Sequence, residues 1–269
     1  MNIVYQLLEN SSRNYQGVLL DEHRTNVCFK GPVRKSLQDY EEQQAILEDL
    51  REVVESLSTT GFDTTLALTD ILSIETAEVD EKRTWRIGEA IAEVVLAEKF
   101  DARFYWNELR DARNPKGNKT GADLVGFVEI DKQVFFLFGE VKTSSQDIRP
   151  NPPNVMTGKG EMMDQMRGIY TDEYKRDILI RYLASKTRNL SDSDSFKIDY
   201  KNATVQYYRK KKKGFSVVGV LVRDVDPLES DINSCYHKLK ADILDHTGLQ
   251  LIACYIPINK DDWYSIINN

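Results

Sequence analysis

Cysteine and histidine are scarce in this sequence and stand far apart. Its 269 residues include three cysteines, Cys28, Cys235 and Cys254, and three histidines. An odd number of widely spaced cysteines with no Cys-x-x-Cys pair argues against a disulfide framework and against a four-ligand zinc site. The N-terminus has neither a basic start nor an apolar stretch long enough for a signal peptide, so we expect a cytoplasmic protein.

Long hydrophobic runs are also missing. The longest, such as residues 217–222 and 249–256, are far shorter than the roughly 20 residues that a helix needs to cross a bilayer, so no membrane segment is expected. Basic residues are not in excess either, because the net charge is −7, which argues against a generally basic nucleic-acid-binding protein. The sequence has no glycine-rich phosphate loop, nucleophile elbow or cofactor fingerprint, which disfavours a small-molecule enzyme.

The negative charge is concentrated in residues 37–80, which hold twelve acidic residues and one basic residue, Arg51. This segment therefore has a net charge of −11, and the rest of the chain has +4. The asymmetry indicates an acidic, partly helical N-terminal extension over residues 1–80 and a main domain over residues 81–269. Apolar residues at helical spacing predict an amphipathic helix over 37–58 that ends near Gly61 and packs within its own chain.

Residues 81–269 alternate between helical and strand patterns. Residues 84–100 are apolar nearly all round, which is typical of a buried helix, and residues 133–142 are apolar on both faces, which is typical of a central strand. The other expected elements are strands over 103–108, 123–130, 215–223 and 249–257, and helices over about 161–187 and 228–246. This order predicts an α/β fold with a mixed central sheet flanked by helices.

The most informative residues are Asp123, after Gly121, and Glu140, Val141 and Lys142, after a second glycine. Residues two apart in a strand point to the same face, so Glu140 and Lys142 project together from an otherwise apolar face. A hairpin between the two strands brings Asp123 beside Glu140, with the Val141 carbonyl nearby. Two carboxylates with water and phosphate oxygens suit Mg²⁺, and a lysine there can orient an attacking water. A structural ion-pair cluster is the competing explanation.

The helix expected over 84–100 contributes a third carboxylate. Glu89 lies on its otherwise apolar surface, with Glu93 one turn further on the same side. A carboxylate in this position either lies at a surface edge of the helix or reaches into a polar site. We therefore expect Glu89 to bind the metal directly or through water, or to position a residue that does.

These residues resemble the motif of the PD-(D/E)xK nuclease superfamily, which has a helix glutamate, an aspartate at a strand start and Glu-x-Lys on the next strand. Asp123, Glu140 and Lys142 match the motif positions, Glu89 fits the helix glutamate, and Ala122 stands where the family usually has proline. The resemblance implies a restriction-endonuclease-like core and a Mg-dependent deoxyribonuclease in which Mn²⁺ can replace Mg²⁺. It implies Asp123, Glu140, Lys142 and Glu89 as catalytic residues, and Asp123, Glu140, Val141 and Glu89 as metal ligands.

Two glutamines are additional candidates for this site. The Gln-x-x-x-Tyr submotif of some members is not matched, because Gln165 and Tyr170 are five residues apart. Gln165 can still face the site from its helix, and Gln146 follows the Glu-x-Lys strand. An ordinary surface amide is the simpler interpretation of each.

The chain length, the acidic N-terminal segment and the phrase Thr-Gly-Ala-Asp-Leu ahead of Gly-Glu-Val-Lys-Thr also resemble the HamA family of bacterial Hachiman antiphage defence. That resemblance implies the effector of a defence complex and a helicase partner that gates the nuclease. The alternative is a catalytically silent nuclease-like subunit that binds nucleic acid or scaffolds the helicase. The presence of Asp123, Glu140 and Lys142 together argues against that alternative.

Two basic stretches fit contact with DNA phosphates. One lies in the turn-rich loop that leads to Asp123, and the other follows Tyr207 and Tyr208, where rings and cations together can hold a strand. A solvated hairpin turn explains the second stretch equally well. The expected nucleic-acid-binding residues are Arg110, Arg113, Lys116, Lys119, Arg209, Lys210, Lys211, Lys212 and Lys213. None of these features reads base sequence, so little sequence preference is expected.

The acidic segment has three explanations. It docks on a basic surface of a partner, since complementary charge steers association. It folds over the chain's own basic loop as an internal shield. It forms a solvated helix whose charge serves only solubility.

Overall fold

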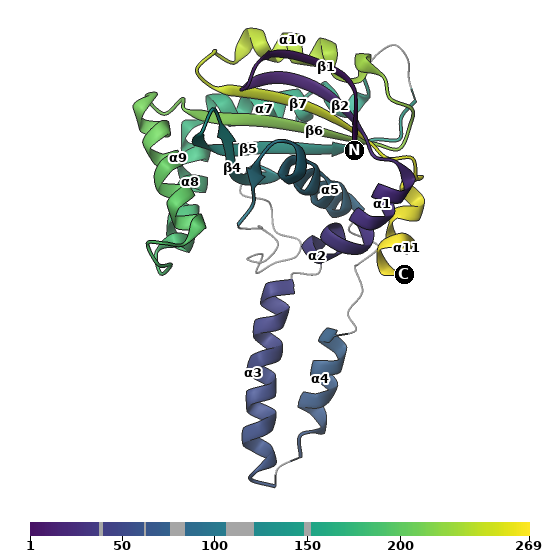
Figure 1. Cartoon of the computed structure of the whole chain (residues 1–269), viewed down its shortest axis with the longest axis vertical. Coiled ribbons are helices and arrows are strands. Elements are labelled where there is room, and N and C mark those ends of the chain that lie inside the picture. The colour runs from purple at the N-terminus through teal and green to yellow at the C-terminus, as the bar shows by residue number, and fades with distance from the viewer. Residues whose placement is uncertain (38–39, 62, 76–83, 106–120, 148–151) are drawn as a thin grey trace.

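The computed structural model describes residues 1–37, 40–61, 63–75, 84–105, 121–147 and 152–269 (Figure 1). In these ranges a seven-stranded mixed sheet has the order β1-β2-β7-β6-β5-β4-β3. The strands are β1 Asn2–Asn10, β2 Arg13–Leu19, β3 Ala102–Arg103, β4 Leu124–Ile130, β5 Gln133–Thr143, β6 Phe215–Arg223 and β7 Gly248–Tyr255. Helices cover both faces, which confirms the predicted α/β fold with a mixed central sheet.

The centre of the sheet is parallel and its margins are antiparallel. Strand β6 lies parallel to β5 and to β7, and β7 lies parallel to β2. Every residue of β6 and β7 is buried, because helices cover both faces of a parallel centre and favour continuous apolar runs. The predicted hairpin joins β4 to β5 through Asp131 and Lys132, whose φ angles of 50° and 62° are typical of a tight type I′ turn.

Two helical layers enclose the sheet. One core contains Phe136 and Phe138 of β5 and is covered by α7 Met162–Thr171, α8 Glu173–Thr187, α9 Ser195–Arg209 and α10 Asn233–Asp242. The opposite core contains Leu137 and Val141 and is covered by α1 Glu22–Cys28, α2 Arg34–Leu37, α5 Thr84–Lys99 and α11 Trp263–Asn268. Short helical segments are η1 Phe29–Val33, η3 Asn154–Met156, η4 Glu229–Asp231 and η5 Lys260–Asp262. No helix in the described part of the chain is long and apolar enough to span a bilayer.

Three expected elements differ in detail. The helix expected over 161–187 is two helices, α7 and α8, because Asp172 adopts an extended conformation and its side chain caps α8. The sequence pattern predicts no helix over 189–213, but this stretch contains α9. The Asp194 side chain caps the first turn of α9. The expected helix over 228–246 is the short η4 followed by α10.

The N-terminal residues belong to the sheet. Arg13–Leu19 pairs in parallel with β7, so the sheet spans the boundary expected at residue 80. The segment that projects away from the sheet is a helical hairpin, α3 Tyr40–Ser58 and α4 Thr65–Glu75 (Figure 1). Leu47 and Ile71 are buried in it, so the predicted amphipathic helix packs within its own chain.

All three cysteines are buried and free, as expected from their number and spacing. Burial raises the pKa of each thiol, and for Cys254 raises it to about 12. Because the thiolate is the reactive form, these side chains act as small apolar groups and not as nucleophiles.

We predict that Gly139→Ala destabilises the fold. A methyl group there would lie 2.5 Å from Val218 Cγ1 and 2.7 Å from the Val218 carbonyl oxygen, inside the central sheet. Overpacking of this kind should lower the free energy of unfolding by about 2 kcal/mol, measured by urea denaturation. The control is Gly168→Ala in α7, where a methyl group meets nothing within 4 Å. It should raise stability by up to about 1 kcal/mol, and an equal loss in both variants would contradict the packing argument.

Candidate metal centre

Asp123 and Glu140 lie at the same end of the sheet. The register pairs Leu124 with Gly139, and the Asp123 N–H donates to the Gly139 carbonyl at 2.9 Å, so Asp123 lies opposite Glu140. Directly opposed residues of antiparallel strands project to the same face. Both carboxylates therefore share the face that Phe136 and Phe138 use, and they end an otherwise apolar strip.

The backbone of Val141 orients Asp123. Its N–H donates to Asp123 Oδ2 at 2.9 Å, while the Val141 side chain packs in the opposite core. In a paired strand the N–H and the C=O of one residue point to the same side. The Val141 carbonyl is therefore directed toward Asp123, and the oxygens expected to bind a metal face one corner of the sheet.

Lys142 supplies the positive charge of this corner. Its Nζ lies 3.0 Å from Glu140 Oε1 and 3.9 Å from Glu161 Oε2. The Glu140 side chain is only 9% exposed, so the ion pair offsets the cost of a buried carboxylate. Glu161 precedes α7 and reaches the site from a separate element. Sequence reasoning missed it, and its position directly before a helix was the available signal.

Glu89 comes from the other side of the sheet. Helix α5 packs on the face that carries Leu137 and Val141, and Gly88 lies against Thr143 at the end of β5. Glu89 is half-buried beside that strand end. Among the described residues no three acidic, histidine or cysteine side chains are grouped to hold a metal, so Glu89 does not complete a three-carboxylate cluster. A role in positioning the other ligands stays a prediction.

The first basic stretch lies outside the described residues. This holds for Arg110, Arg113, Lys116 and Lys119, and for residues 106–108 of the strand expected over 103–108. The described part of that region contains only the two-residue β3, Ala102–Arg103, and residues 104–105 are not in a strand. The next described residue is Gly121, two residues before Asp123.

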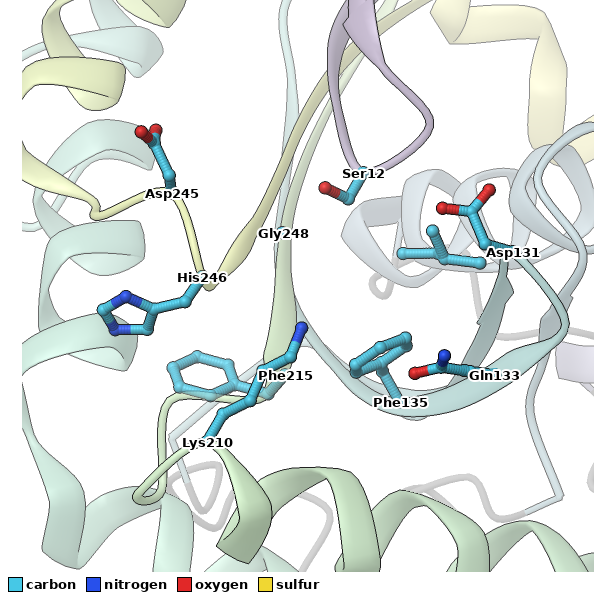
Figure 2. A pocket seen from close by; sticks show the side chains of 10 residues that line it. Ser12, Asp131, Gln133, Phe135, Lys210, Phe215, Asp245, His246 and Gly248 are labelled. Carbon is cyan, nitrogen blue, oxygen red and sulfur yellow. The ribbon is translucent and has the colours of Figure 1, made fainter.

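The second basic stretch, Arg209 to Lys213, ends helix α9 and forms the turn before β6. Lys210 Nζ lies 4.9 Å from the centre of the Phe135 ring, in a cavity of about 210 Å³ (Figure 2). Phe135 is seven residues from Lys142 along β5, or about 23 Å. The structure therefore places this stretch near the opposite end of the sheet from Asp123 and Glu140.

Lysines of this stretch are engaged within the protein. Lys212 Nζ lies 2.6 Å from Glu173 and 2.9 Å from Asp177, and these bonds raise the pKa of Lys212. Lys213 Nζ lies 4.2 Å from the centre of the Tyr170 ring, and desolvation lowers the pKa of that lysine. The segment is a helix end with internal ion pairs and not the expected alternative of a hairpin turn.

The two glutamines differ in what they bind. Gln146 Oε1 accepts from the Asn154 N–H at 2.7 Å, and its carbonyl accepts from the buried Arg223 at 2.8 Å. Gln146 thus braces the loop after β5. Gln165 is half-buried in the first turn of α7, near Glu161, and makes a long 3.5 Å contact with the Gly160 carbonyl.

We predict that Mn²⁺ binds the wild-type protein and that Glu140→Ala abolishes binding, because the mutation removes one of two carboxylate ligands. Glu89→Gln should weaken binding by about 10-fold to 100-fold, as expected for a residue that orients ligands. Isothermal titration calorimetry measures both. The control is Glu129→Ala, an exposed carboxylate near the other end of β4, which should bind as wild type does. Equal binding by wild type and Glu140→Ala would exclude this centre.

Comparison with protein-family models, curated proteins and solved structures finds no match to this chain. The predicted resemblance to PD-(D/E)xK nucleases therefore rests on Asp123, directly before β4, and on Glu140 and Lys142 near the end of β5.

Proposed function

We propose that this protein is a metal-dependent phosphodiesterase that cleaves DNA with little sequence preference. The observation that carries the proposal is one corner of the sheet where Asp123, Glu140 and Lys142 meet. The corner combines two carboxylates and a backbone carbonyl with an ammonium group. Hard oxygen donors of this kind suit Mg²⁺, which binds few protein ligands and keeps water and phosphate oxygens.

The residues fit the metal by their chemistry. Asp123 is fixed by the Val141 N–H through Oδ2, so its orientation is set before any ion arrives. Glu140 is buried, and a cation beside it lowers the cost of its charge. When bound, Mg²⁺ would lower the pKa of a bound water and offset negative charge on the phosphate.

Lys142 acts next to these ligands. Its ammonium group lies 3.0 Å from Glu140 Oε1 and 3.9 Å from Glu161 Oε2. From that position it can donate hydrogen bonds to an attacking water and to a phosphate oxygen. Glu161 keeps the lysine oriented from the α7 side of the site.

A catalytically silent subunit is the second candidate. The observation in its favour is that Lys142 already has two carboxylate neighbours, which is what a structural ion-pair cluster requires. In that case the same residues would stabilise the sheet corner, and the protein would bind nucleic acid or scaffold a partner without cutting.

Plasmid cleavage separates the two candidates. Wild type should cut DNA with Mg²⁺ or Mn²⁺, and Glu140→Ala and Lys142→Ala should each slow cutting by about 100-fold or more, because they remove charge stabilisation of the transition state. Glu140→Ala should unfold at nearly the wild-type urea concentration, because it removes the buried charge together with its ion pair. The control is Lys238→Ala, an exposed lysine of α10. Variants that unfold easily while wild type cuts nothing would support the silent subunit.

The same proposal places the nuclease in a cytoplasmic antiphage complex with a helicase. Its support is the projecting hairpin, where Glu48, Asp49, Glu52 and Glu55 of α3 are exposed. Leu66, Leu68 and Leu72 of α4 are also exposed, at 81%, 51% and 59%. An acidic surface with exposed leucines fits a partner surface that is basic around an apolar centre.

Charge reversal of the hairpin tests this docking. A variant with lysine at positions 48, 49, 52 and 55 should lose binding to the helicase encoded alongside, measured by gel filtration of the co-expressed proteins. Its own DNA cleavage should stay at the wild-type rate, because the hairpin points away from the sheet (Figure 1). Faster cleavage would instead support an internal shield, and no change in either assay would leave solubility as the role of the charge.

A further inference from the structure

Lys175 lies beside the chain segment that enters the candidate metal centre. A methyl group placed on Gly121 would lie 2.9 Å from Lys175 Cγ and 3.0 Å from its Cδ. The lysine side chain therefore passes directly over Gly121. Gly121 is two residues before Asp123, so their Cα atoms lie within about 7 Å of each other.

Only glycine fits at position 121 beside the Lys175 side chain. Its φ of 119° is a conformation that residues with a side chain rarely adopt, and any Cβ would collide with the lysine. The glycine thus leaves room for the half-buried Lys175 side chain against the backbone that leads to Asp123.

The acidic side chains around Lys175 on α8 are engaged elsewhere. Asp172 accepts from the Lys175 backbone N–H at 3.0 Å and caps the helix. Glu173 and Asp177 both bind Lys212. No carboxylate of the described residues lies within ion-pair distance of the Lys175 ammonium group.

Helix stability does not explain a lysine at this position. Lys175 is in the first turn of α8, where the helix dipole favours negative charge and opposes positive charge. A cation at this end of a helix is instead suited to an anion that none of the described residues supplies.

We propose that Lys175 binds a backbone phosphate of the DNA strand next to the phosphate that is cut. The inference rests on the proposed nuclease function. Lys142 contacts Glu140 and serves the reacting phosphate, whereas Lys175 packs on Gly121, two residues before Asp123. A lysine binds phosphate as a point charge without reading bases, which fits cleavage with little sequence preference.

The test is DNA binding and cleavage by the full-length Lys175→Ala variant. At low salt its KM for DNA should rise about 5-fold with kcat unchanged, because a lost phosphate contact weakens binding uniformly. Fluorescence anisotropy with a short labelled duplex should show the slope of log K against log salt falling by about one. Lys175→Arg should restore most of both, since it keeps the charge.

The matched control is Lys186→Ala. Lys186 lies on the same side of α8, eleven residues or about 16 Å further along the helix. It should bind and cut as wild type does. Equal effects of the two alanine variants, or a fall in kcat with KM unchanged, would overturn the assignment of Lys175. The anisotropy measurement separates failure of this site from failure of the proposed function. If the duplex binds through Lys175 but is never cut, the proposed nuclease function is contradicted. If cutting does not depend on Lys175, only the assignment of Lys175 is contradicted.

Discussion

The buried carboxylate of Glu140 is the constraint on which the site depends. It follows Val134, Phe136 and Phe138 on one face of β5, and an isolated charge in such a place costs several kcal/mol. Lys142 at 3.0 Å supplies the opposite charge, and Glu161 lies 3.9 Å from the same ammonium group. The two carboxylates at this corner of the sheet would also favour the binding of a divalent cation, which would offset their charge. The ion pair and the proposed metal site therefore both compensate this one buried charge.

Polar contacts connect this corner to the N-terminal edge of the sheet. Arg223 donates to the Gln146 carbonyl in the loop after β5 and lies 3.4 Å from Asp231. Asp231 accepts from Tyr255, whose hydroxyl lies 2.6 Å from that of Tyr5 on β1. Burial raises the pKa of both tyrosines, so their hydroxyls stay protonated and hydrogen-bonded. The first strand thereby helps to brace the loop that follows Lys142.

Charge has different uses in different parts of the molecule. In the basic run after Tyr208, Lys210 and Lys212 bind the protein's own ring and carboxylate groups. Lys175 lies outside the two predicted basic stretches and has no ion pair among the described residues. The acidic hairpin exposes its carboxylates. The density of charge in the sequence therefore does not predict which cations are free to bind an external anion, because ion pairing depends on what folds against each side chain.

The sequence by itself determined the elements whose signals are local. Strand β6 has the predicted bounds, and the β4–β5 hairpin follows from alternation and a two-residue turn, which is why Asp123 and Glu140 could be placed together. The pairing of β2 with β7 joins residues more than 200 apart and has no local signal. The same holds for Glu161 beside Lys142 and for Lys175 over Gly121. Only the tertiary structure decided these contacts, because periodicity reports which face of an element is buried and not which element covers it.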